Sequence, residues 1–249
     1  RRFYGVQARG LYGDQEPHET FEEMADAYIE EIRTVQPRGP YFLGGFSGGG
    51  ITAYEIAQKL EALGEEVALL VMLDTPVPEP PAALSVQDRV AIQKRQFADK
   101  GAGYFAEWAV TRWQWEVGKL KKRFDDVGSE QPTDTFHDEA IEAAFRTALT
   151  SYTVKPWKGS IKLYRPKLPI AFDLGNGRLL NAQRDYVHED NGWRPFVGSV
   201  DIVEVPGDHD SMVLEPSVRV LARHIRGAID EAESSRRTRA IDSATESAS

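Results

Sequence analysis

The sequence predicts an α/β fold in which a mainly parallel sheet is flanked by helices. The main observation is that short apolar stretches alternate with amphipathic helical stretches in the first 73 residues, as in sheets whose strands are joined by helices. A second observation is that Val67–Leu73 is apolar at every position, which is typical of a strand buried on both faces. A chain of 249 residues is long enough for one such domain.

Four segments before Val67 supply this alternation. A T-x-x-E capping box at Thr20 and Glu23 predicts the start of the first helix, because apolar residues recur behind it at helical spacing as far as Val35. The sequence QPRGP ends this helix, and Gly64 ends the next one. In chain order we expect a strand at 3–7, a helix at 20–35, a strand at 41–46 and a helix at 51–63.

A long helical segment interrupts the alternation after DTPVPEPPA at 74–82. Between two strands of one sheet it is far longer than a usual connection, and inserted segments of this size are often lids. We therefore expect one domain at 1–233 with a helical lid at about 84–156.

The alternation returns after the lid and ends near the C-terminus. SIKLYRP at 160–166 and VDIVEVPG at 200–207 have strand character, and Pro216 opens a last helix. The final stretch at 234–249 has no apolar period, and we expect it to be a disordered tail.

Ser47 carries the strongest functional signal in the chain. Gly45-Phe46-Ser47-Gly48-Gly49 satisfies G-x-S-x-G between an expected strand and an expected helix. In a nucleophile elbow the serine adopts a strained backbone, and the flanking glycines Gly45 and Gly49 avoid collisions. The N–H of Gly48, at the helix start, is then placed to stabilise an oxyanion.

Phosphate-binding loops fit the glycine-rich stretch less well than a nucleophile elbow. A P-loop requires Lys-Ser or Lys-Thr after its last glycine, whereas Gly50 is followed by Ile51-Thr52. The pattern G-x-G-x-x-G does not fit residues 44–53 at all. A purely structural turn stays open as the alternative.

His209 is the expected base among five histidines. It follows directly after the strand that ends near Val205, and the carboxyl ends of strands are where α/β sheets assemble their sites. The other four lie in less suggestive places and are expected to be structural or solvated: His18, His137, His188 and His224.

Asp74 is the expected acid partner of His209. It ends the apolar strand Val67–Leu73, and a carboxylate there is costly to bury without a partner. Asp173 is the competitor, because it follows a later strand, whereas Asp208 and Asp210 adjoin the histidine too closely. The order Ser47, Asp74, His209 matches the order in α/β-hydrolases.

The composition excludes several other classes of function. A net charge of −9 argues against nucleic-acid binding, which normally needs a basic patch. Without cysteine the chain has no disulfide, thiolate metal site or cysteine nucleophile. The longest apolar run, Val67–Leu73, is too short to span a bilayer. The chain does not open with a signal peptide, so we expect a cytoplasmic protein.

The chain resembles the type I thioesterase domains that end modular nonribosomal peptide and polyketide synthases. YGVQARGL, the approach to GGFSGGG, EVALLVMLDTPVP, NGWRPFVG and VEVPGDHDSMVLEP carry this resemblance, from about Phe3 to about Asp230. It implies an α/β-hydrolase fold, with Ser47 as nucleophile, Asp74 as acid in preference to Asp173, and His209 as base.

The resemblance also implies a substrate, a partner and a missing segment. An acyl chain would arrive on the phosphopantetheine of a carrier protein and leave by hydrolysis or cyclisation, with no bound metal or cofactor. In this family a strand and a glycine-containing loop supply a second oxyanion donor, and we expect both to lie before Arg1. Candidate channel residues are Phe46, Tyr104, Phe105, Trp108 and Trp113, and a basic cluster at 119–123 is a carrier dock or a solvated helix face.

Three alternatives to a chain-releasing thioesterase stay open. A free-standing carboxylesterase would prefer oxygen esters, and an editing type II thioesterase would differ by its genomic context. A binding module without catalysis would bind acyl chains or carriers without turnover.

Overall fold

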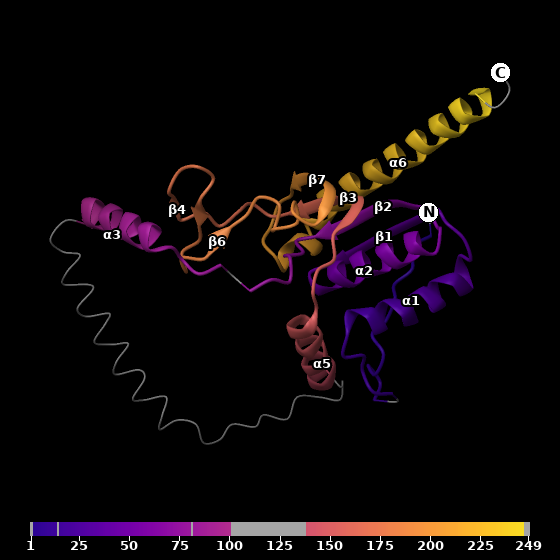
Figure 1. The fold of residues 1–249 in the computed structure, drawn as a ribbon, viewed down its shortest axis with the longest axis horizontal. Coiled ribbons are helices and arrows are strands. Elements are labelled where there is room, and N and C mark those ends of the chain that lie inside the picture. Colours follow the sequence, from indigo (N-terminus) through magenta and orange to yellow (C-terminus); the bar gives the residue numbers. More distant parts are fainter. Residues whose placement is uncertain (1, 14, 81, 101–137, 247–249) are drawn as a thin grey trace. The chain divides into compact units, whose positions relative to one another are not determined.

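A four-stranded parallel sheet is the main sheet of the structure, a computed structural model that describes residues 2–13, 15–80, 82–100 and 138–246 (Figure 1). Neighbouring strands pair in the order β1-β2-β3-β7, and every pair is parallel. This sheet confirms the predicted α/β fold. The bounds of its strands are β1 Tyr41–Phe46, β2 Val67–Leu73, β3 Trp157–Arg165 and β7 Val197–Glu204.

Helices cover both faces of this sheet, as the apolar run of β2 predicts. Leu70 and Met72 belong to a core cluster that includes Tyr54 of α2 (Gly48–Ala62). Val71 belongs to another cluster with Leu221 of α6 (Val218–Glu246). Because successive side chains of a strand point to opposite faces, β2 is buried on both sides. Helix α1 (Phe21–Val35) packs on α2.

Two compact units divide the chain. The first comprises 1–80, 136–168 and 188–249, and the second comprises 81–135 and 169–187. Helix α5 (Asp138–Ser151) therefore belongs to the first unit, whereas α3 (Val86–Lys100) belongs to the second. The expected lid at 84–156 is thus divided between them.

The second unit contains α3 and a small antiparallel sheet, β4-β5-β6. Asp88 of α3 is buried, and its carboxylate accepts hydrogen bonds from the Tyr186 hydroxyl at 2.6 Å and the Ser85 hydroxyl at 2.7 Å. The Tyr186 hydrogen bond is the main cause that lowers the pKa of Asp88. The contact with Tyr186 joins α3 to the small sheet. The strands are β4 Phe172–Asp173, β5 Leu179–Leu180 and β6 Tyr186–Val187.

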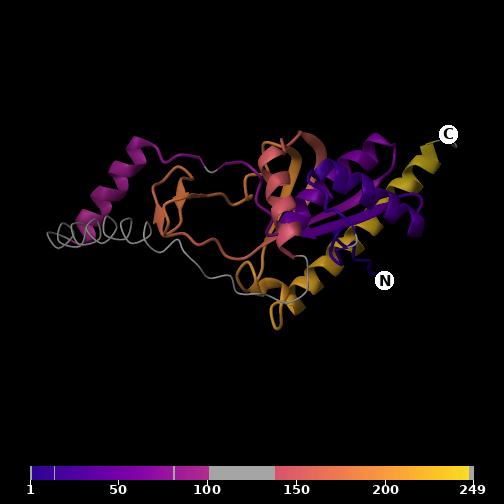
Figure 2. The same cartoon turned by 90° about the horizontal axis from the view of Figure 1, so that it is seen from below.

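Two predictions at the chain ends differ from the structure. Residues 3–7 form no strand: no described strand pairs with them, and Phe3 is 91% exposed. The expected tail at 234–249 is helical as far as Glu246, where α6 ends, and this half of α6 extends past the sheet (Figure 2). Two features explain why α6 continues here. The first half of α6 packs on the sheet, so its extension does not bear the cost of helix nucleation. In addition, Arg236 forms an ion pair with Glu66 at 2.7 Å.

Candidate active site

Ser47 lies at the sharp junction between β1 and α2. Its backbone has φ 51° and ψ −122°, a combination that a residue with a side chain rarely adopts. The N–H of Ser47 donates to the carbonyl of Leu73 at 2.9 Å, which ties the junction to the end of β2. Strained backbone of this kind gathers at functional sites, and the geometry is that of the predicted elbow.

Close packing explains why position 45, before Ser47, is a glycine. It does not explain Gly49, the second glycine at which we expected a collision. A Cβ on Gly45 would lie 2.1 Å from the carbonyl carbon and oxygen of Gly49. A Cβ on Gly49, in contrast, would meet nothing within 4 Å. The expectation that a side chain at Gly49 would collide is therefore wrong, because this Cβ direction is open. Gly50 is the restricted position instead, since its Cβ would lie 2.0 Å from Thr75 Oγ1.

Gly48 begins α2, so its N–H is among the first four of the helix, which have no acceptor within the helix. The helix dipole favours negative charge at this end. Phe145 of α5 lies directly over Gly48, because a Cβ there would be 2.0 Å from Phe145 Cζ. Phe145 also packs edge-on against Phe21, with ring centroids 5.4 Å apart, so the ring has little freedom to withdraw.

Gly48→Ala is therefore expected to lower turnover by about 10- to 100-fold, because a displaced Phe145 or elbow misplaces the reacting groups. Steady-state kinetics with an acyl thioester measure this effect. Gly49→Ala is the matched control and should cost less. Adding Phe145→Leu to Gly48→Ala should restore part of the loss, and a purely additive double variant would contradict this explanation.

Asp74 and His209 meet at the ends of β2 and β7. His209 Nδ1 lies 2.8 Å from Asp74 Oδ2. The side chain of Asp74 is 20% exposed and that of His209 is 44% exposed. Asp74 has a positive φ of 43°, and its N–H donates to the carbonyl of Tyr164 at 2.7 Å. The structure thus brings two of the three predicted catalytic residues into contact.

Phe46 connects this pair to the elbow. Its ring centroid lies 4.9 Å from that of His209, with the planes tilted by 30°, and Phe46 directly precedes Ser47. The Ser47 hydroxyl itself makes no hydrogen bond with the described residues. The imidazole therefore lies beside the elbow without a hydrogen bond to the serine.

The competing acids have other partners. Asp173 belongs to the second unit, where its Oδ1 accepts from the N–H of Gly175 at 2.8 Å. Asp208 accepts from the N–H and the hydroxyl of Ser211 at 2.9 and 2.6 Å. The hydrogen bond from the Ser211 hydroxyl lowers the pKa of Asp208. The carboxylate that is hydrogen-bonded to His209 is that of Asp74, which favours Asp74 as its partner.

Asn191 is a site residue that sequence reasoning missed. Its Nδ2 donates to the other oxygen of Asp74, Oδ1, at 3.0 Å. The motif NGW at 191–193 is present in the sequence, but nothing in it indicates that Asn191 lies near Asp74 at the end of β2. Trp193 of the same motif is buried and donates from Nε1 to the carbonyl of Thr75 at 2.8 Å.

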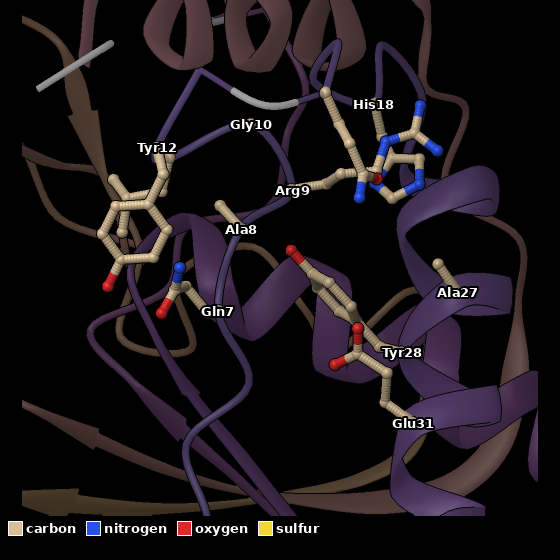
Figure 3. A pocket seen from close by; sticks show the side chains of 11 residues that line it. Gln7, Ala8, Arg9, Gly10, Tyr12, His18, Ala27, Tyr28 and Glu31 are labelled. Atoms are coloured by element: carbon tan, nitrogen blue, oxygen red, sulfur yellow. The ribbon is translucent and has the colours of Figure 1, made fainter.

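A separate pocket of about 200 Å³ lies between α1 and the segment before it (Figure 3). None of its lining residues is Ser47, Asp74 or His209. His18 lines it and is buried, and this burial, followed by the charge of Arg9, lowers the pKa of His18. His18 was expected to be structural or solvated, and the structure places it among the buried residues.

Several predicted residues lie outside the part of the chain that the structure describes. They are Tyr104, Phe105, Trp108 and Trp113 of the expected channel, and Lys119, Lys121, Lys122 and Arg123 of the basic cluster. Within the described ranges, no group of three or more His, Asp or Glu side chains is arranged to hold a metal ion. No helix in those same ranges is long and apolar enough to cross a bilayer.

Comparison with known proteins gives the family. The family model "Thioesterase domain" matches residues 1–229. A dimodular nonribosomal peptide synthase of Bacillus subtilis (strain 168) is 49% identical over 221 residues, which are 84% of this chain but only 8% of that protein.

Solved structures agree with this family. A four-domain nonribosomal peptide synthetase, holo-AB3403 bound to AMP and glycine, matches with a TM-score of 0.53 and 28% identity over 88% of this chain and 17% of that one. The NocB thioesterase domain, in a covalent complex with a fluorophosphonate nocardicin G analog, matches with a TM-score of 0.56 and 22% identity over 90% of this chain and 81% of that one. The predicted α/β-hydrolase type of fold is thereby confirmed, and the chain belongs to the thioesterase domain family.

Proposed function

We propose that the chain is a thioesterase that releases an acyl, polyketide or peptidyl chain from a carrier protein through an ester on Ser47. The observation that carries this proposal is the combination of a strained serine at the β1–α2 junction with the Asp74–His209 hydrogen bond of 2.8 Å. In a serine hydrolase these are the nucleophile, the group that orients the base, and the base.

The first half of the reaction forms the ester. Asp74 accepts the hydrogen bond from Nδ1–H of His209, which leaves Nε2 free to take the proton of the Ser47 hydroxyl. Ser47 Oγ attacks the thioester carbonyl, and the developing oxyanion lies towards the N–H of Gly48. The C–S bond then breaks, and the departing thiolate takes the proton from His209.

The second half releases the acyl chain. Water, or a hydroxyl or amine of the chain itself, gives a proton to His209 and attacks the ester carbonyl. The C–Oγ bond breaks, and Ser47 regains its proton from His209. Water gives a free acid, whereas an internal nucleophile gives a ring.

A carrier protein is the proposed partner. The synthase relatives are far longer than this chain, so the chain corresponds to one domain within them. We infer that the thioester reaches Ser47 on the flexible phosphopantetheine arm of a carrier. The proposed reaction needs no metal, since the N–H of Gly48 stabilises the oxyanion.

Intact-protein mass spectrometry tests this proposal. The protein is mixed with a short acyl-pantetheine thioester and quenched over a time course, and the adduct is mapped by digestion. We expect an acyl adduct on the peptide that contains Ser47, together with release of one thiol per acyl group.

The mass of the released acyl product then separates hydrolysis from cyclisation. An oxygen ester with the same acyl group serves as the comparison substrate. A clear preference for the oxygen ester would favour a carboxylesterase. Binding of the thioester without an adduct or thiol release would exclude the thioesterase and leave a binding module.

A further inference from the structure

Both oxygens of the Asp74 carboxylate have a partner. Oδ2 lies 2.8 Å from His209 Nδ1, and Oδ1 accepts from Asn191 Nδ2 at 3.0 Å. A carboxylate held at one oxygen only can rotate about its χ2 bond, which is a soft torsion. Donors on both oxygens fix the plane of the carboxylate, and with it the direction in which the imidazole is held.

The main chain of Asn191 is itself fixed. Its φ is 50°, in the left-handed region that asparagine tolerates better than most residues. The N–H of Asn191 donates to the carbonyl of His188 at 3.1 Å, and its carbonyl accepts from the N–H of Val77 at 2.9 Å. The second of these bonds joins the loop of Asn191 to the chain that leaves β2 just after Asp74.

Neighbouring side chains hold the same loop in place. The carboxylate of Asp190 accepts from the N–H groups of Gly192 and Arg194 at 3.2 and 2.8 Å. Trp193 is completely buried and donates to the carbonyl of Thr75 at 2.8 Å. Asn191 therefore approaches Asp74 from a rigid loop, and its amide is held in place before any substrate arrives.

We propose that Asn191 is a positioning residue of the active site, which orients the Asp74 carboxylate so that His209 is kept ready to take the proton of Ser47. This inference rests on the function proposed above. A neutral donor suits the place, because it holds the carboxylate without cancelling the negative charge that stabilises the protonated imidazole.

Asn191→Gly tests the role of the amide alone, because glycine adopts a φ of 50° without strain. We expect kcat to fall by about 10- to 100-fold, the range for losing a hydrogen bond to a charged group. KM should stay within about twofold, since the amide acts on the reacting groups and not on substrate binding. Kinetics with an acyl-pantetheine thioester and thermal unfolding are measured on the full 249-residue chain.

Asn176→Gly is the matched control. Asn176 also has a left-handed backbone, with φ 54°, and it is exposed. Its side chain makes no hydrogen bond with the described residues. The same Asn→Gly change therefore reproduces the backbone effect without removing a contact to Asp74, and its kcat should equal that of the wild type.

The outcomes separate this inference from the proposed function. If the wild type turns over the thioester and Asn191→Gly does so equally well, the positioning role is wrong and the thioesterase stands. Equal losses in Asn191→Gly and Asn176→Gly would also overturn it. If the wild type shows no turnover, the proposed function fails and this inference fails with it.

Discussion

Ser47→Ala is expected to lower thioester turnover by about 10⁴- to 10⁶-fold, because no ester can form without the hydroxyl. The fold should survive, since alanine is smaller than serine and the N–H of residue 47 still donates to the carbonyl of Leu73. Substrate affinity should change little. Rates are measured by thiol release under saturating substrate, with binding measured separately by calorimetry.

Ser235→Ala is the control for this change. Ser235 is an exposed residue of α6, and its replacement should leave the rate unaltered. Turnover by Ser47→Ala at more than about a hundredth of the wild-type rate would mean that water attacks the thioester directly. Covalent catalysis through a serine ester would then be the wrong mechanism for this protein.

Asp74→Asn should lower kcat by about 10⁴-fold while leaving the fold intact. The structure gives a specific reason for so large an effect. Asn191 donates to Oδ1 of Asp74, so in the variant it would hold the carbonyl oxygen of the new amide on its own side. The NH₂ group would then face His209 and donate to Nδ1, which leaves the proton on Nε2, where the imidazole cannot act as a base.

Asp173→Asn is the matched control for the acid. Asp173 is exposed and belongs to the second unit, where its Oδ1 accepts a hydrogen bond that an asparagine oxygen can also accept. Its kcat should equal that of the wild type. A large loss in Asp173→Asn with near-normal Asp74→Asn would reverse the choice of acid that the sequence and the structure both favour.

The sequence predicted the sheet because its signals are local. The continuous apolar run of β2 and the capping box at Thr20 each act within a few residues, and the Thr20 hydroxyl does accept from the N–H of Glu23 at 3.2 Å. Residues 3–7 showed the limit of such signals, since a strand also requires a partner that local sequence does not specify. Helix α6 extends beyond the residues that have apolar periodicity, because adding residues to a helix that has already formed costs little free energy.

The site was predictable where its residues are marked by motifs or by strand ends. Ser47 follows from G-x-S-x-G, while Asp74 and His209 follow from their places after β2 and β7. Asn191 could not be found this way, since 117 residues separate it from Asp74. The same holds for Phe145 over Gly48, because that contact depends on how α5 packs and no pattern in the sequence encodes it.

The positive φ of Ser47 has a consequence for heat resistance. A residue with a side chain at such a position costs of order 1–3 kcal/mol, so the backbone of Ser47 lowers the stability of the fold. Glycine usually destabilises relative to alanine by about 0.4–1 kcal/mol, through its freer unfolded chain. At this position the order should reverse or vanish, with Ser47→Gly melting no lower than Ser47→Ala in calorimetry. A clearly lower melting temperature for Ser47→Gly would mean that the backbone at this junction is relaxed and costs the fold no stability.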